Sequence, residues 1–327
     1  MASKNRIDVH QHVVPPVWAD ALPSHGGDPS GWQGPTWSPE RAIAFMDSQQ
    51  IGTGVLSLTA PGVQGWRGQP KLDMARQVNE YTAGLVAKHP TRFGNFATVP
   101  LPDIDGTLKV IEHSLDTLNA DGLVLLSNYD GQYLGDPTFE TVWAELNRRK
   151  AVVFIHPAKP KIDAIPGMPG PVLDYPFDTT RTAVQMVLNG VIARNPDVRI
   201  ILSHAGGFLP YASHRFAKLA PGVRKDVPTT EEILKQLQTY YFDFALSSSL
   251  AALPTLTAFA KKGHIMYGSD YPYAPVEVSA SFARQLDAYT AQSEDEHAAI
   301  NSTNALALFP RLARQERDEL FKTRNAA

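Results

Sequence analysis

The chain has 327 residues, and its 30 lysines and arginines against 33 aspartates and glutamates give a net charge of −3. A chain this close to neutral lacks the basic surface that a nucleic-acid-binding protein needs. Its 43% hydrophobic and 19% charged residues are typical of a globular protein and not of a disordered one.

Several further classes are excluded by what the sequence does not contain. There is no cysteine, which rules out disulfides and thiolate metal ligands. Apolar runs such as Ala151 to Ile155 are too short for a membrane-spanning helix, which needs roughly 18 residues. The first residues lead into a strand-like segment without an apolar signal region. We therefore expect a cytoplasmic protein with no membrane partner, of a length that fits one large α/β barrel or two ordinary domains.

Short apolar segments rich in β-branched residues recur along the chain and predict buried strands. Most are continuously apolar, as in parallel strands that are covered on both faces. The eight predicted strands are Ile7–His12, Gly54–Leu58, Phe93–Val99, Gly122–Leu126, Val152–His156, Val198–His204, Tyr240–Ala245 and Ile265–Asp270.

Segments with helical periodicity separate these strands. They are Ser38–Gln50, Leu72–His89, Glu140–Lys150, Thr179–Asn195, Glu231–Gln238 and Leu253–Lys262. Ser38 is the expected N-cap of the first, with Pro39 at its first helical position. This alternation favours a single (β/α)8 TIM barrel over residues 1–327, with a helical tail at about 295–327. An open doubly wound sheet is the alternative, which the absence of a GxGxxG motif after the first strand disfavours.

Histidines and an aspartate stand at the carboxyl ends of four predicted strands. The first strand ends at His10-Gln11-His12, where the two imidazoles would point to the same face. His156 ends the fifth strand, His204 the sixth and Asp270 the eighth. Because barrel enzymes carry their active sites at these strand ends, we expect the five side chains to meet there.

Imidazole and carboxylate ligands favour a divalent metal ion, with Zn²⁺ as the first choice and Mn²⁺ or Fe²⁺ as alternatives. Asp8, two residues before His10, is either an outer partner that orients an imidazole or a strand-end cap. The fourth predicted strand and Ser127 after it contain no Lys, Glu or His that would bridge two ions. We therefore expect one metal ion.

Two long loops, His25–Pro39 and Lys159–Asp174, exceed the usual length of connections, and such loops tend to be functional. The first contains Trp32 and Trp37. We expect Trp37 to contact an aromatic substrate and interpret Trp32 as packing at the barrel mouth.

Taken together, these motifs resemble the amidohydrolase superfamily. They are Asp-x-His-x-His in the first strand, His-Pro at 156–157, Ser-His-Ala-Gly-Gly at 203–207 and Gly-Ser-Asp-Tyr-Pro at 268–272. The sequence looks most like the metal-dependent decarboxylase branch, which includes the aminocarboxymuconate-semialdehyde, γ-resorcylate and salicylate decarboxylases. Residues 27–40, 56–63 and 246–249 are similar to the 6-methylsalicylate decarboxylases of that branch.

The resemblance implies roles for individual residues. His10, His12, His156 and Asp270 match the metal ligands, and His204 matches a catalytic histidine beside the metal. Asp270 also matches the proton donor of the benzoate decarboxylases, whereas the semialdehyde decarboxylase suggests a metal-activated hydroxide with His204 as base. Arg215 matches an arginine that binds the substrate carboxylate from the neighbouring subunit, so a homodimer is expected.

The expected reaction is the non-oxidative decarboxylation of an ortho-hydroxybenzoate, most closely of 6-methylsalicylate to 3-methylphenol and CO₂. A mononuclear metal-dependent hydrolase of a lactone or amide is the alternative on the same scaffold. A catalytically silent barrel that acts as a scaffold is a third hypothesis, which the complete set of five His and Asp groups disfavours.

Overall fold

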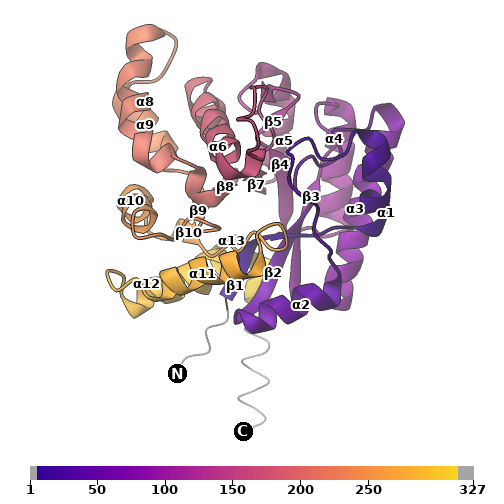
Figure 1. Cartoon of the computed structure of the whole chain (residues 1–327). Helices are drawn as coiled ribbons and strands as arrows, with labels where there is room; N and C mark the ends of the chain where they lie inside the picture. The colour runs from indigo at the N-terminus through magenta and orange to yellow at the C-terminus, as the bar shows by residue number, and fades with distance from the viewer. Residues whose placement is uncertain (1–5, 316–327) are drawn as a thin grey trace.

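The computed structural model describes residues 6–315, in which eight parallel strands curve around a common axis (Figure 1). In their order around the sheet they are β1 (Arg6–His12), β2 (Ile51–Ser57), β3 (Phe93–Thr98), β4 (Gly122–Leu126), β7 (Val152–His156), β8 (Arg199–Leu202), β9 (Tyr241–Asp243) and β10 (Ile265–Met266). The chain after β10 closes the ring onto β1, since Val9 N donates to Tyr267 O at 3.0 Å and Asp270 N to His10 O at 2.8 Å. The predicted (β/α)8 barrel is therefore confirmed.

Helices surround this barrel on its outer side (Figure 1). The longer ones are α2 (Pro39–Ser48), α3 (Gly68–Lys88), α4 (Ile104–Glu112), α5 (Glu140–Arg148), α6 (Gly170–Leu188), α8 (Leu209–Val223), α9 (Thr230–Leu237), α10 (Ala252–Phe259) and α11 (Val276–Asp287). Shorter ones are α1 (Pro16–Ala21), α7 (Val191–Arg194), α12 (Glu294–Ala298) and α13 (Asn304–Leu308), and β5 (Asn128–Tyr129) pairs with β6 (Gln132–Tyr133) as a small hairpin. No helix in residues 6–315 has the length and apolar character to cross a membrane.

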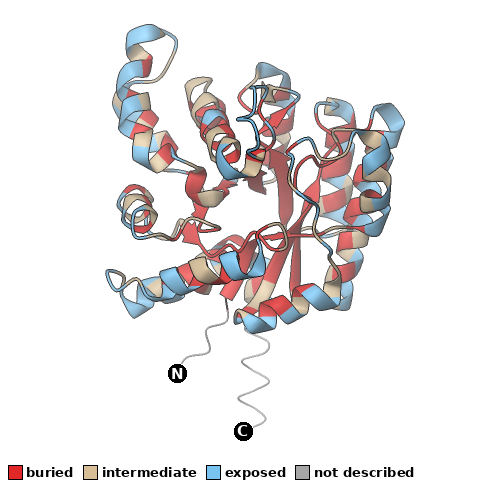
Figure 2. Ribbon diagram, viewed as in Figure 1, coloured by how far each residue is buried: buried red, intermediate tan, exposed pale blue. Residues whose placement is uncertain are grey.

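The strands are buried almost throughout, as the red barrel of Figure 2 shows. Apolar side chains such as Val9, Phe96 and Phe154 form one cluster with Phe309. The segment after α13 covers the amino ends of the strands, because Arg311 donates to the carbonyl of Phe93, the first residue of β3, at 3.0 Å. Apolar side chains fill this end of the barrel. A polar active site is therefore expected at the carboxyl end of the strands.

A β-bulge in β1 changes the direction of its side chains just before the predicted ligands. Asp8 pairs with Gly54 of β2, but Gln11 pairs with Leu56, so β1 carries one extra residue between them. Val9 can therefore join the apolar interior while His10 points into the barrel mouth, a use of bulges that is common beside active sites. Gln11 fills the space over Gly54, where a Cβ would lie 2.6 Å from its Oε1.

Some predicted boundaries differ from the observed ones for clear physical reasons. Ser38 is the N-cap of α2, accepting from Arg41 N, with Pro39 at the helix start as predicted. The predicted helix Thr179–Asn195 instead begins at Gly170, because Pro171 lies in the first turn, where no backbone donor is needed, and it ends before Gly190, whose φ is +75°. Part of the predicted loop Lys159–Asp174 is therefore helical.

The described C-terminal part contains α12 and α13, and the helical tail at about 295–327 stays a prediction. The rest of that tail, from residue 316, and residues 1–5 lie outside the described residues. That residues 1–327 form a single domain stays a prediction.

Candidate metal centre

The five predicted side chains meet at the carboxyl end of the barrel. His10 and His12 come from β1, His156 from the last position of β7, and His204 and Asp270 from the turns that follow β8 and β10. Ligand atoms of His10, His156, His204 and Asp270 all lie within 4.8 Å of one another. His12 Nε2 lies 3.2 Å from His10 Nε2 and 3.0 Å from Asp270 Oδ1. The arrangement suits a metal ion.

The outer nitrogens of three imidazoles determine where their protons lie. His10 Nδ1 is 2.9 Å from the carboxylate of Asp243, His12 Nδ1 is 3.2 Å from the carbonyl of Ser57, and His156 Nδ1 is 2.9 Å from the carbonyl of Pro157. Carbonyl and carboxylate oxygens only accept hydrogen bonds, so in the neutral imidazoles each Nδ1 donates. Each Nε2 then turns a lone pair toward the shared centre, which is the donor set that a divalent cation requires.

His204 differs from these three histidines. Its Nδ1 is buried and has no hydrogen-bond partner within residues 6–315, while its Nε2 lies 3.4 Å from Asp270 Oδ2. No acceptor among the described residues therefore fixes a proton on Nδ1 of His204. The backbone of both residues is left-handed, with φ of 52° at His204 and 61° at Asp270, a strained conformation that often occurs at functional sites.

Asp243, at the end of β9, is a functional residue that sequence reasoning missed. It is fully buried, its Oδ2 accepts from His10 Nδ1, and its Oδ1 accepts from the backbone N–H groups of His204 at 3.0 Å and Ala245 at 2.8 Å. One carboxylate thus orients an imidazole and holds the turn that carries His204. The available signal was an aspartate within an apolar predicted strand, Tyr240–Ala245.

Asp8 is a strand-end partner and does not contact an imidazole. Its carboxylate accepts from the backbone N–H groups of His10 and Ser269, both at 3.0 Å, and from the side chain of Gln11 at 2.9 Å. These bonds join the bulge of β1 to the segment after β10. Of the two interpretations given to Asp8, the structure supports the cap.

The electrostatics of the centre follow from burial and from two carboxylates. Burial disfavours a charged His10, but Asp243 and Asp270 outweigh it and raise the pKa of His10 to about 10, so a metal ion would take the place of a proton on Nε2. Burial lowers the pKa of His12, and burial together with the neighbouring imidazoles lowers the pKa of His156 well below its usual value. Burial is also opposed at Asp270, where the adjacent His10, His12 and His204 hold the pKa of the carboxyl well below its usual range. The carboxylate is therefore charged and available as a ligand.

A cavity of about 310 Å³ opens directly onto this centre. His156, His204 and Asp270 form its polar floor with Thr59. Its other walls are mostly apolar or aromatic, and they include Trp32, Val172, Tyr175, Leu246, Tyr273 and Val278. No lysine or arginine among the described residues lines it. It has the size and apolar lining of a small-molecule site.

Two predicted substrate contacts lie outside this cavity. Trp37 is half-buried against the hydrophobic core, and Trp32 of the same loop lines the cavity instead, with its Nε1 donating to Tyr273 O at 3.1 Å. A contact of Trp37 with substrate therefore has no support in this geometry, because the loop folds that indole inward. Arg215 is exposed on α8 and does not line the cavity of its own chain.

Comparison with known proteins places this centre in a family. Residues 7–311 match the amidohydrolase family model. The decarboxylase yanB of Aspergillus niger is 43% identical over 98% of this chain and 92% of its own length. The 6-methylsalicylic acid decarboxylase of Penicillium expansum is 41% identical over 94% of this chain and 97% of its own.

A solved structure of an amidohydrolase II superposes with a TM-score of 0.87 and 31% identity, covering 93% of this chain and 99% of that one. Fold, ligand geometry and sequence similarity thus agree. The chain belongs to the amidohydrolase family, and its relatives of 40% identity or more are decarboxylases.

Proposed function

We propose that this protein is a metal-dependent, non-oxidative decarboxylase of an ortho-hydroxybenzoate, with 6-methylsalicylate as substrate and 3-methylphenol and CO₂ as products. The observation that carries the proposal is an aromatic-lined cavity whose floor is the histidine–aspartate centre. The relative from Penicillium expansum, named for 6-methylsalicylic acid, supports the choice of ring substituents.

The centre fits one divalent ion, for which we propose His10, His12, His156 and Asp270 as ligands. Three Nε2 lone pairs and a carboxylate oxygen converge there, and without a cation they would face one another at distances such as 3.2 Å between His10 and His12. Such nitrogen and oxygen ligands suit Zn²⁺ first and Mn²⁺ or Fe²⁺ as alternatives. When bound, the ion supplies positive charge that stabilises the carboxylate and phenol oxygens of the substrate.

Loss of CO₂ from a hydroxybenzoate requires a proton on the ring carbon that carries the carboxylate. His204 and Asp270 lie on the cavity floor with Nε2 and Oδ2 3.4 Å apart, so they can hold one proton between them. We assign the catalytic proton to this pair. The aromatic walls, including Trp32 and Tyr175, hold the ring over the pair and exclude water from it.

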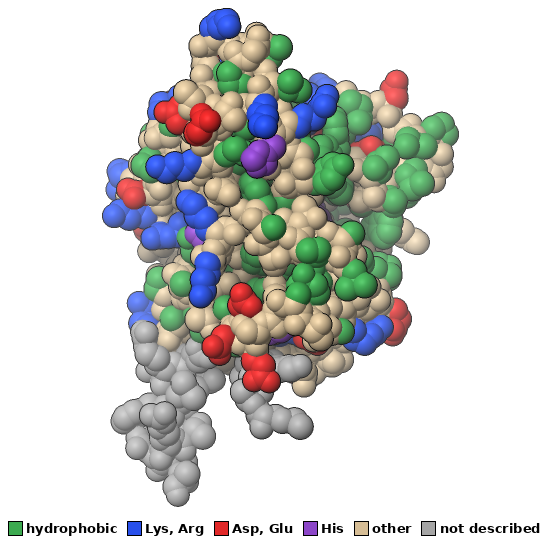
Figure 3. All heavy atoms as spheres, turned by 90° about the vertical axis from the view of Figure 1, so that its left-hand side faces the viewer, with side chains coloured by type: hydrophobic (Ala, Val, Ile, Leu, Met, Phe, Trp, Pro, Cys, Tyr) green, Lys and Arg blue, Asp and Glu red, His purple; other side chains and the backbone are tan. Residues whose placement is uncertain are grey.

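The substrate carboxylate lacks a basic side chain in the cavity of its own chain. We therefore assign this role to Arg215 of a second copy, as the predicted homodimer requires. Arg215 is exposed on α8, and Tyr211 and Val223 of the same helix are 84% and 83% exposed. Figure 3 shows apolar side chains interspersed with charged ones on this side of the molecule.

The experiment that tests the function is incubation of the purified protein with 6-methylsalicylate, with 3-methylphenol followed by chromatography and metal content measured by atomic emission. We expect phenol formation that stops after chelation and returns with Zn²⁺ or Mn²⁺. Product without metal dependence would contradict the mechanism. Absence of phenol from this and other hydroxybenzoates, together with hydrolysis of a lactone or amide, would favour the alternative.

A further inference from the structure

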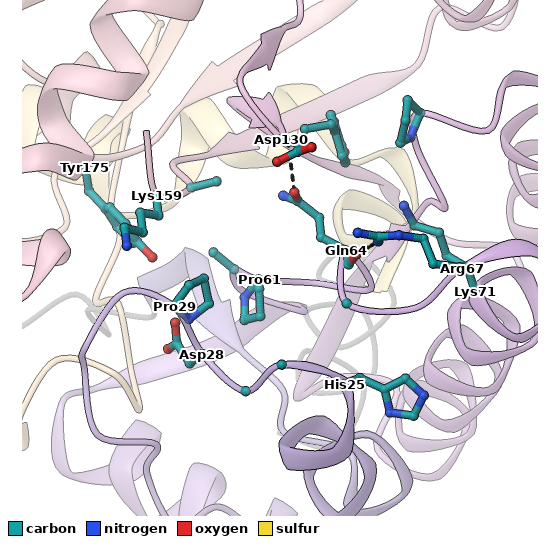
Figure 4. A pocket seen from close by; sticks show the side chains of 17 residues that line it. His25, Asp28, Pro29, Pro61, Gln64, Arg67, Lys71, Asp130, Lys159 and Tyr175 are labelled. Carbon is teal, nitrogen blue, oxygen red and sulfur yellow. Dashed lines mark hydrogen bonds between the residues drawn. The ribbon is translucent and has the colours of Figure 1, made fainter. Parts of the chain in front are cut away.

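A second cavity of about 430 Å³ lies beside the substrate cavity (Figure 4). It is enclosed by residues 25–29 of the first long loop and by segment 61–71, which leads into α3. Asp28, Ala60 and Tyr175 line both cavities, so the two share a wall. The proposed reaction makes no use of the other residues that line it.

Three cations line this second cavity: Arg67 and Lys71 lie on one side, without a carboxylate partner among the described residues, and Lys159 lies on the other. Arg67 is exposed, and its guanidinium donates only to backbone carbonyls, those of Gln64 and Trp66. Lys71 is buried, with 6% of its surface exposed, and its Nζ donates to Leu101 O at 2.6 Å. Neither forms an ion pair within residues 6–315. A buried ammonium without an ion-pair partner is unfavourable, and an anion in the cavity would compensate its charge.

Three carboxylates of this region have partners of their own; Asp28 and Asp130 line the cavity, and the charge of Asp103 also acts on Lys71. Asp130 forms an ion pair with Lys161 at 3.1 Å, and Asp28 accepts from Ser30 N at 2.8 Å. Asp103 accepts from Gly106 N at the start of α4 at 3.0 Å. In Figure 4, Arg67 and Lys71 lie on one side of the cavity, and Lys159 and Tyr175 lie on the other. The side formed by Arg67 and Lys71 is therefore positively charged.

Arg67 is the N-cap of α3 and Lys71 lies in the first turn of that helix, so the two cations come from one short stretch of chain. Burial first, and the neighbouring Arg67 second, lower the pKa of Lys71 to about 8. The 21-residue helix α3 begins directly after Arg67, with no side-chain cap and no acidic residue in its first turn. Its positive end adds to the potential that an anion would experience.

We propose that this second cavity binds a small oxyanion, such as phosphate or bicarbonate, between Arg67 and Lys71. Both anions present charged oxygen acceptors, which guanidinium and ammonium groups bind strongly. Bicarbonate is the hydrated form of the CO₂ that the proposed reaction releases, and phosphate would come from the surrounding solution. The site does not depend on the proposed reaction, and its test does not use activity.

The test is titration calorimetry with phosphate and, separately, with bicarbonate at constant pH and ionic strength. Metal-loaded and chelator-treated protein are compared, because an anion at the metal centre would be lost with the metal. We expect one anion per chain in both samples, with at least tenfold weaker binding in Arg67→Gln. Lys88→Gln is the matched control, since Lys88 is an exposed cation at the opposite end of α3.

Arg67 is the primary variant because its exposed side chain can be changed without disturbing the core, and Lys71→Met should reproduce its effect. Binding of either anion in the expected pattern supports the site and identifies which anion it takes. Binding of neither, loss of binding with the metal, or unchanged affinity in Arg67→Gln would overturn the proposal. If the protein is inactive on every hydroxybenzoate but still binds the anion in this pattern, the anion-site proposal stands while the proposed function fails.

Discussion

Replacing Asp243 by asparagine should reverse the tautomer of His10. Oδ1 of Asp243 accepts two backbone N–H groups, at 3.0 and 2.8 Å, so the amide oxygen of the introduced asparagine must stay on that side. The amide NH₂ then faces His10 Nδ1, where the carboxylate now accepts at 2.9 Å. Two donors cannot share that contact, so the proton of His10 moves to Nε2 and removes the lone pair that faces the metal.

We expect Asp243→Asn to weaken metal binding about 10- to 100-fold, the usual effect of removing an outer partner of a ligating histidine. That ratio corresponds to about 1.4–2.8 kcal/mol. The assay is competition for Zn²⁺ with a chromophoric chelator, with thermal melting of the metal-free protein measured beside it to separate metal affinity from folding.

Asp121→Asn is the matched control for this substitution. The Asp121 side chain is 3% exposed and pairs with Arg311 at the amino end of the barrel, so its loss should lower stability without changing metal affinity. Wild-type metal affinity in Asp243→Asn, or an equal loss in both variants, would show that the Asp243–His10 contact does not govern the centre.

Four further outcomes are expected. His204→Ala should keep the metal but lose most turnover, whereas Asp270→Ala should lose both; full activity in either, with unchanged metal content, would remove the assigned pair. Because the pKa of Lys71 is about 8 in the folded protein, against 10.5 ordinarily, the unfolded chain binds more protons between these values. The free energy of unfolding of the wild type should therefore rise relative to Lys71→Met by about 2–3 kcal/mol between pH 8 and 10.5, as followed by denaturant titration. Gly65→Ala should lower thermal stability by about 1–3 kcal/mol, because a Cβ there would lie 1.9 Å from the carbonyl oxygen of His25; a neutral effect would show that the loop moves freely. Arg215→Ala should lose turnover with metal retained, and analytical ultracentrifugation should find a dimer; an active monomer would contradict the role in trans.

The barrel was predictable because each of its buried parallel strands corresponds to a continuous apolar segment of the sequence. The predicted start of β1 at Ile7 and its end at His12 lie within one residue of the observed bounds, Arg6–His12. The eighth strand was less predictable: its regular part ends at Met266, and the chain from Tyr267 to Asp270 is held by backbone bonds to β1. The sequence around residue 267 gives no indication that this segment pairs with β1, which is far away along the chain.

The candidate ligands were predictable for a similar reason, since each lies at or near the carboxyl end of an apolar predicted strand. The contacts that orient them were not. His12 Nδ1 is positioned by the carbonyl of Ser57 and His156 Nδ1 by that of Pro157, and a backbone carbonyl has no sequence signature. The sequence also did not show which indole of the first long loop lines the cavity. Trp32 lines it and Trp37 packs against the core, but the conformation of so long a loop has no local sequence signal.

The contacts at the outer nitrogens give the four histidines different roles. In His10, His12 and His156 the outer nitrogen donates to a fixed acceptor, so the inner nitrogen can serve only as a lone-pair donor. An imidazole that is held in this way and binds the ion cannot also take up and release a proton during a reaction. His204 alone among the four has an outer nitrogen without a partner in the described residues, and it lies against Asp270. A centre that binds a cation and also moves a proton needs both kinds of imidazole, and His204 is the only one here that leaves the second task open.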